Sequence, residues 1–147
     1  MKDLEKIQNL QRENLAVKLS KDEIQSEGFV TLVHSLEVLE QLHSLSPSVI
    51  IKDEDELAAY ALVMTKEARQ LVPALEPMFQ LLDNLYYHNR LIKDYNYYVM
   101  GQICIAKPLR GKGLFDKLYQ KHRELFKDTY DFVVTEIATR NSRSLRA

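Results

Sequence analysis

Cysteine is scarce in this sequence, and both a long apolar run and a leader segment are missing. The 147 residues include one cysteine, Cys104, so no intramolecular disulfide can form, and a reducing intracellular setting is expected. No run of about 18 apolar residues occurs, and no charged segment followed by an apolar one opens the chain. We therefore expect a cytoplasmic protein that neither spans nor binds a membrane.

An excess of charge of either sign is also missing. The formal net charge is −1, with 28% charged residues against 46% hydrophobic ones. Nothing supplies the broad basic field that nucleic-acid binding needs, so nucleic acid is not expected as a partner. The length and composition are those of one globular domain over residues 1–147, long enough for a substantial core.

Metal-ligand and nucleophile patterns are absent as well. The four histidines lie far apart, and none has a second ligand at helical or hairpin spacing: His34, His43, His88 and His122. No metal site is expected, and each histidine is interpreted as a surface or packing residue. Cys104 would need a nearby base to act as a nucleophile. The sequence indicates none, so packing as a small hydrophobe is preferred.

Residues 99–115 carry the most informative pattern in the chain. An apolar run ends at Lys107 and Pro108, a loop with Gly111 and Gly113 follows, and an amphipathic pattern then begins. One helical face is expected to hold Leu114, Phe115, Leu118, Tyr119, His122, Leu125 and Phe126. The stretch therefore predicts a strand, a tight loop and a helix in that order.

The loop of this unit has two interpretations. Gly111 and Gly113 allow the backbone to approach a ligand closely, and the free N–H groups of a helix N-terminus favour an anion such as a phosphate. Arg110 and Lys112 would add mobile positive charge at the same place. By pattern alone an ordinary strand-to-helix turn is about as well supported, because two glycines two residues apart are a weak signal.

Helical and strand patterns also occupy the rest of the chain. Ser35 is placed to cap a helix that ends before Pro47. Residues 48–51 and 57–64 predict a hairpin with a solvated, charged turn. The remaining expected elements are a short helix or loose arm at 1–13, strands at 15–19, 97–105 and 130–139, an amphipathic stretch at 75–86, and a final helix capped around Asn141.

The strand at 97–105 has apolar residues on both faces, which indicates an interior strand of a covered sheet. Alternation puts Tyr97, Val99, Ile103 and Ile105 on one face and Tyr98, Met100 and Cys104 on the other. Gly101 in its middle predicts a bulge or a close approach by a ligand. The expected fold is a layered α/β (α+β) structure, with a mixed, mostly antiparallel sheet and helices on both faces.

Glu136 is the most suggestive ionisable residue. It shares a strand face with Phe132, Val134 and Ala138, so its carboxylate should be partly desolvated and able to take a proton from an ammonium group. A buried glutamate held by an arginine or a backbone N–H is an equally good interpretation.

Tyrosines gather at both ends of the polar connection before the central strand, at 86–87 and at 95–98. Their rings and hydroxyls suit an acceptor pocket. Packing at a strand edge explains them nearly as well.

The loop sequence resembles the acetyl-CoA-binding segment of the GCN5-related N-acetyltransferases, which reads Arg/Gln-x-x-Gly-x-Gly/Ala. Phe115 stands where that family usually has a small residue. The resemblance implies the family's acyltransferase fold, with acetyl-CoA as the co-substrate and no metal. It also implies that the pyrophosphate contacts the loop, which consists of Arg110, Gly111, Lys112, Gly113, Leu114 and Phe115.

The same resemblance implies roles for other residues. In that family the strand before the loop splays from its neighbour and leaves backbone groups free for the pantetheine arm, which here nominates Ile103, Cys104 and Ile105. An asparagine after the later strand commonly contacts the cofactor, which nominates Asn141. The implied chemistry is direct attack of an acceptor amine on the thioester, with a backbone N–H stabilising the oxyanion and Glu136 as the candidate catalytic residue.

The C-terminus departs from the family pattern. The family usually has a tyrosine or another proton donor further along the helix after that asparagine, and two closing strands follow, whereas this chain ends at Ala147. We expect either a C-terminally truncated form or a chain completed by a partner. A further expectation is that this form either self-associates through the sheet edge near residues 131–139 or is markedly less stable than a longer version.

Two functions from different classes remain open. The first is an N-acetyltransferase that acts on an amine of a small molecule or a peptide. The second is a non-catalytic acyl-CoA-binding or protein-interaction module on the same fold. The motif concerns the donor only, so the sequence predicts no particular acceptor.

Overall fold

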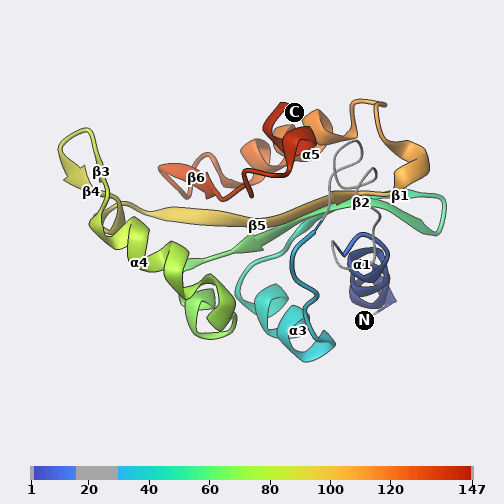
Figure 1. Ribbon diagram of the computed structural model, residues 1–147, viewed down its shortest axis with the longest axis horizontal. Helices are drawn as coiled ribbons and strands as arrows, with labels where there is room; N and C mark the ends of the chain where they lie inside the picture. The colour runs from blue at the N-terminus through green and yellow to red at the C-terminus, as the bar shows by residue number, and fades with distance from the viewer. Residues whose placement is uncertain (1, 16–29, 147) are drawn as a thin grey trace.

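The computed structural model describes residues 2–15 and 30–146, and its centre is a four-stranded sheet (Figure 1). The strands run in the order β1-β2-β5-β6, and their bounds are Val49–Asp53, Glu56–Met64, Tyr97–Ile105 and Phe132–Thr135. The first three pair antiparallel, and β6 pairs parallel to β5. The predicted mixed, mostly antiparallel sheet and the interior position of the strand at 97–105 are confirmed.

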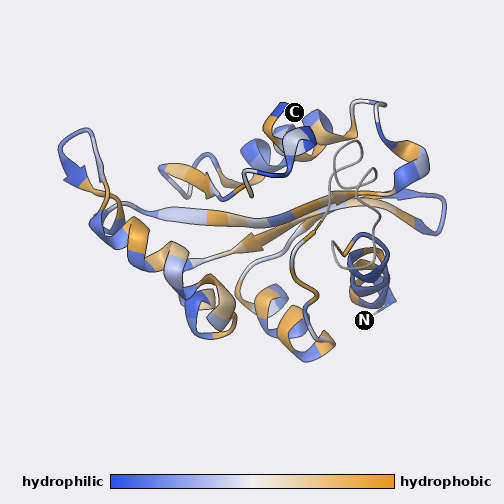
Figure 2. Ribbon diagram, in the orientation of Figure 1, coloured by the Kyte–Doolittle hydropathy of each residue, from blue (hydrophilic) through white to orange (hydrophobic). Residues whose placement is uncertain are grey.

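Helices cover both faces of this sheet (Figure 1). On one face lie α1, α3 and α4, with bounds Lys2–Glu13, Leu36–Leu45 and Glu76–Asn84. On the other lies α5, Leu114–Phe126. Figure 2 shows hydrophobic residues along the central strands and alternating with hydrophilic ones along α3 and α4. The layered α+β fold is therefore as expected.

Local sequence signals account for several boundaries. The Ser35 side chain accepts a hydrogen bond from the backbone N–H of Val38 at 3.2 Å, which caps α3 as predicted. In α5, Leu118, His122 and Phe126 are buried. Leu125 is 48% exposed, so its predicted place on the buried face is wrong.

The predicted amphipathic stretch at 75–86 is shorter than expected. Helix α4 ends at Asn84, and Tyr86–Tyr87 (β3) pairs with Arg90–Leu91 (β4) in a small hairpin. His88 and Asn89 both have positive φ, as a two-residue hairpin turn requires. Short 3-10 turns complete this connection at Lys66–Gln70 (η2), Pro73–Leu75 (η3), Ile92–Asp94 (η4) and, after β5, Lys107–Leu109 (η5).

Three tyrosines of this connection pack against Phe132, whereas Tyr98 lines a cavity of about 460 Å³ beside α5. The rings of Tyr87 and Tyr95 lie 5.4 and 5.1 Å from the ring of Phe132, and Tyr97 stacks on the same phenylalanine at 6.1 Å. For these three tyrosines the packing interpretation is therefore the better one.

Gly101 forms the predicted bulge. Leu62 is opposite Gln102 and Val63 is opposite Met100, so Gly101 has no partner on β2. The extra residue shifts the alternation of β5 by one position. As a result Tyr97 and Val99 share a core with Cys104, whereas Met100 packs with Ile103 and Ile105 on the opposite face. The predicted division of the strand into two faces is wrong beyond the glycine for this reason.

The strand predicted at 130–139 is only four residues long in β6. Asp131 anchors its start, because its N–H donates to the Asn96 carbonyl at 2.7 Å and its carboxylate accepts from the Asn96 N–H at 2.9 Å. After Thr135 the chain leaves the sheet and reaches α6, Ser142–Arg146.

The expected strand at 15–19 lies outside the described residues, apart from Leu15, which forms an isolated parallel bridge with Val30. None of the helices within residues 2–15 and 30–146 combines the length and the apolar character that crossing a membrane requires.

Candidate functional site

The candidate site lies where β5 and β6 separate. The two strands pair from Tyr97–Phe132 to Met100–Thr135, and the Thr135 hydroxyl donates to the Met100 carbonyl at 3.4 Å. Beyond this point β5 continues for five residues, to Ile105, while the chain after β6 turns away. A cavity of about 240 Å³ opens in the gap.

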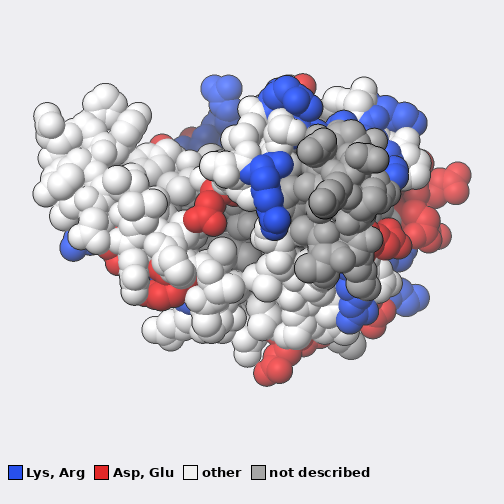
Figure 3. Space-filling view, in the orientation of Figure 1, with Lys and Arg blue, Asp and Glu red and all other residues white. Residues whose placement is uncertain are grey.

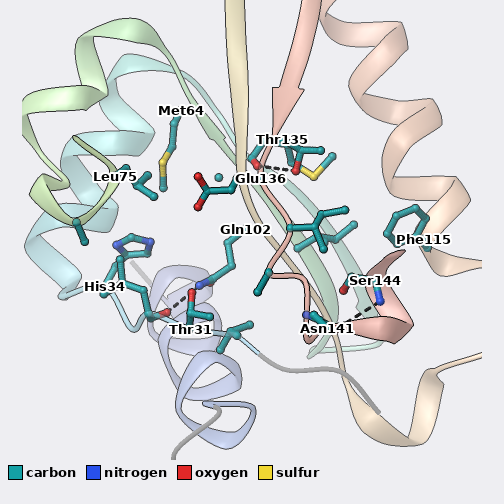
Figure 4. Close-up of a pocket in the computed structure, with 18 of the residues that line it drawn as sticks. Thr31, His34, Met64, Leu75, Gln102, Phe115, Thr135, Glu136, Asn141 and Ser144 are labelled. Atoms are coloured by element: carbon teal, nitrogen blue, oxygen red, sulfur yellow. Dashed lines mark hydrogen bonds between the residues drawn. The ribbon is translucent and has the colours of Figure 1, made fainter. Parts of the chain in front are cut away.

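This cavity reaches both faces of the sheet (Figure 4). Met64, Leu75 and His34 line it from the α3 and α4 side. Ile103, Phe115 and Tyr119 line it from the α5 side, where they meet the segment that carries Asn141 and Ser144. Two molecules that enter from opposite faces would therefore meet inside the sheet.

Glu136 is the acidic side chain that lines the cavity among the described residues. It follows directly after β6, and its carboxylate points toward Met64 and Leu75 in Figure 4. The residue is exposed, so the predicted partial desolvation is wrong. The reason is that β6 ends at Thr135, before the alternation of a strand could turn Glu136 into a covered face.

Gln102 fixes one wall of the cavity. Its amide oxygen accepts from the Tyr60 hydroxyl at 2.6 Å, and its amide nitrogen donates to the Leu32 carbonyl at 2.7 Å. The side chain thereby ties the irregular segment 30–34 to the sheet. Sequence analysis missed Gln102 because nothing in a strand pattern distinguishes a glutamine that faces such a gap.

His34 lies on the same segment and is almost fully buried. Its backbone N–H donates to Gln11 and its carbonyl accepts from Gln8, both at 2.9 Å, so α1 holds it in place. Burial lowers the pKa of His34, which makes the neutral imidazole the dominant form at neutral pH. From the sequence it was interpreted as a surface or packing residue, because no second metal ligand lies at helical or hairpin spacing from it.

The glycine loop before α5 has an open backbone. Gly111 and Gly113 have φ of 75° and 74°, and a Cβ on either would meet nothing within 4 Å. Glycine is therefore favoured at both positions by the positive φ of the backbone, and not by a lack of space for a side chain. Gly113 precedes the first turn of α5 with no side-chain cap, so the N–H groups of that turn remain available to an anion. Phe115, in the same turn, lines the cavity.

Arg110 does not act as mobile charge. Its Nε donates to the Ile105 carbonyl at 3.0 Å, and its Nη2 donates to the Asn14 side chain at 2.5 Å. The expectation for Arg110 is wrong because the guanidinium is used to fold the loop back onto β5. Lys112, in contrast, is exposed. Figure 3 shows basic side chains along the edge where the loop, α5 and α6 lie in Figure 1.

The structure brings together only some of the nominated residues. Ile103, Phe115, Glu136 and Asn141 all line the cavity. Asn141 is buried, and its side-chain oxygen accepts from the N–H of Ser144 at 3.4 Å, which caps α6 as predicted.

The other nominated residues lie around the cavity or away from it. Cys104 faces the opposite core, where burial raises the pKa of its thiol to about 12, so it is not an activated nucleophile. Leu114 and Ile105 pack in the core beneath α5. Within the described chain, no three His, Cys, Asp or Glu residues gather in a way that could hold a metal ion.

Comparison with known proteins supports the fold alone. No family model matches the sequence, and no curated protein matches it. A solved structure of a point mutant of the BH1408 protein from Bacillus halodurans has a TM-score of 0.59 and 10% identity, covering 97% of this chain and 83% of that one. The structure of a tetramutant of the same protein has a TM-score of 0.59 and 12% identity, and the match covers 97% of this chain and 84% of that one. Neither name states an activity.

Proposed function

We propose that the chain is an N-acetyltransferase that moves the acetyl group of acetyl-CoA to an amine. The observation that carries the proposal is the cavity between β5 and β6, which is lined from both faces of the sheet. A bisubstrate transfer needs such a passage, because the donor and the acceptor must approach one carbon atom from different sides.

The donor side of the proposal rests on the loop that resembles the GCN5-related N-acetyltransferases. The residues present fit a pyrophosphate. Gly111 and Gly113 leave open space above the backbone, and the first turn of α5 has no side-chain cap. Lys112 adds an exposed positive charge beside them. Phe115 then borders the cavity into which the acyl end of the donor would extend.

The chemistry is a direct displacement. The amine nitrogen attacks the thioester carbonyl, the C–N bond forms, the C–S bond breaks, and the thiolate leaves. Glu136 takes the proton from the attacking nitrogen, directly or through a water. Backbone N–H groups of β5 beyond Met100 stabilise the developing oxyanion. Tyr119 lines the same cavity, and burial raises the pKa of its phenol, so it stays protonated and can protonate the thiolate.

A non-catalytic acyl-CoA-binding or interaction module on the same fold is the second candidate. The exposure of Glu136 favours it, because a general base acts best where water is excluded.

Two measurements, made one after the other, test the proposal. Calorimetric titration with acetyl-CoA should show saturable one-to-one binding, with coenzyme A as the matched ligand that lacks the acetyl group. A free-thiol assay over a panel of amines should then show amine-dependent release of thiol above the rate of hydrolysis. Binding without amine-dependent release would favour the non-catalytic module, and absence of binding would reject both.

A further inference from the structure

We infer that the acceptor is a small primary amine with a short, compact body and no carboxylate beside its nitrogen. This inference rests on the proposed transfer and deepens it. The observations concern the part of the cavity on the α3 and α4 side of the sheet, which we call the acceptor chamber. It is defined by Thr31, Leu75, Met78, Val99, Gly101 and Glu136.

The acceptor chamber is small, and its lining combines apolar side chains such as Met78 and Val99 with polar groups. It has a volume of about 120 Å³ and joins the larger cavity through walls that both share, at Thr31, Leu75 and Glu136. Met78 and Val99 belong to the core behind it. A space of this size accepts a short branched side chain but not a folded peptide.

The charge of the lining favours a cation. Glu136 is the one Asp, Glu, Lys or Arg among the described residues that line either cavity. His34 sits close by, but its lowered pKa keeps it neutral. No described Lys or Arg lines the two cavities. An ammonium group thus has a partner in Glu136, whereas a carboxylate on the same ligand would meet no cationic side chain among the described lining residues and would repel Glu136.

The α4 wall of the chamber is fixed in place. Arg69 donates from Nε and Nη2 to the two carboxylate oxygens of Glu76, at 2.7 and 2.5 Å, and from Nη1 to Asp83 at 2.8 Å. The guanidinium also lies over the ring of Phe79 at 5.5 Å. These contacts hold α4 against η2, so the chamber cannot widen easily around Leu75. Its size therefore acts as a selection on the acceptor.

Three matched probes separate charge from size: isopentylamine, leucinamide and leucine. They share the same branched body, and only leucine has a carboxylate beside the nitrogen. Titrated into protein saturated with coenzyme A, isopentylamine should bind at least tenfold more tightly than leucine, and leucinamide should lie between them. In the thiol assay with acetyl-CoA, kcat/KM should follow the same order.

Two variants locate the effect. Glu136→Gln should weaken isopentylamine binding about tenfold while leaving the dissociation constant of acetyl-CoA unchanged. Leu75→Ala should enlarge the chamber and improve the binding of 2-phenylethylamine relative to isopentylamine by several-fold. Lys127→Ala, on a surface away from both cavities, is the control and should change neither value.

The outcomes distinguish this inference from the function on which it rests. Equal binding of leucine and isopentylamine, or acetyl transfer to leucine at an equal rate, would overturn the acceptor class while acetyl transfer itself stands. Absence of acetyl-CoA binding would overturn both. Selective binding of isopentylamine that Glu136→Gln does not weaken would also contradict the inference, because Glu136 would then not be the recognition group.

Discussion

Met64 and Gly101 touch across the bulge that separates the two halves of β5. A Cβ on Gly101 would lie 2.4 Å from the Met64 sulfur and 2.9 Å from its Cγ, closer than real contacts allow. Met64 is almost fully buried and also lines the cavity. A side chain at this position would have to displace the end of Met64, so the bulge and the wall of the cavity are coupled.

Replacement of Gly101 by alanine should destabilise the fold by about 1 kcal/mol, the low end of the cost of overpacking, because the flexible end of Met64 can shift toward the cavity. Urea unfolding measures the change. The matched experiment is a double-mutant cycle with Met64→Ala, which removes the contacting atoms. In the Met64→Ala background, Gly101→Ala should lower the free energy of unfolding much less. An unchanged loss would show that the contact with Met64 does not cause the destabilisation.

Gly113 and Lys112 should affect acetyl-CoA binding in different ways. Gly113→Ala and Gly113→Val both force a side chain onto a positive φ, at about 1–2 kcal/mol, but only valine projects bulk over the loop. We expect Gly113→Val to lower affinity much more than Gly113→Ala. Lys112→Ala should lower it about two- to fivefold and make it less salt-dependent. Calorimetry at two salt concentrations measures both effects, and parent-like binding by Gly113→Val would exclude the loop as the site.

Tyr119→Phe should slow turnover about tenfold or more, because the thiolate loses its proton donor. Acetyl-CoA affinity should stay within about twofold, since the ring remains. Tyr130→Phe is the control, because Tyr130 does not line the cavity. A Tyr119→Phe enzyme with parental kcat would remove the tyrosine from the mechanism.

Stability should fall in alkaline solution in two steps. Burial raises the pKa of Cys104 from 9 to about 12 and that of Tyr98 from 10 to about 12. A group whose pKa is raised on folding contributes its full stability below the unfolded value and loses it as pH rises toward the folded one. Cys104 should therefore weaken the fold from pH 9, and Tyr98 from pH 10.

Urea midpoints between pH 8 and 11 test this order. Cys104→Ala should remove the slope between pH 9 and 10 and keep the steeper loss above it. Rapid reaction of the native thiol with a thiol reagent at pH 8 would contradict the burial of Cys104.

Self-association through β6 is expected to depend on strand pairing. β6 is the outermost strand on its side of the described sheet, and Val133 is 38% exposed on it. Sedimentation over a concentration series should show association, and Val133→Lys should reduce it. Leu125→Lys, at a more exposed apolar position on α5, should have little effect. Identical behaviour of both variants would exclude the β6 edge.

The elements of the fold followed from periodicity, and the errors came where a local irregularity changed it. The helix from Leu114 and the cap at Ser35 have patterns that fix them locally. The faces of β5 were wrong beyond Gly101, although the bulge itself was predicted, because its one-residue shift was not carried into the alternation. Leu125 lies at the margin of the buried face of α5, where a small rotation of the helix decides whether a side chain is buried.

The candidate site was only partly predictable from sequence. Ile103, Phe115, Glu136 and Asn141 were nominated and do line one cavity, since a strand and the loop after it form one edge of the gap. His34 and Gln102 were missed. Their places depend on hydrogen bonds to α1 and to Leu32, and contacts between distant segments leave no local pattern.

Arg110 joins the loop to Asn14, a residue 96 positions earlier at the end of α1. Any ligand that holds the loop in its present shape would, by mutual linkage, also favour the docked state of the N-terminal helix. Acetyl-CoA should then slow proteolytic cleavage near residues 2–15. Conversely, deletion of those residues should weaken the binding of acetyl-CoA in a titration, even though every residue of the loop is retained.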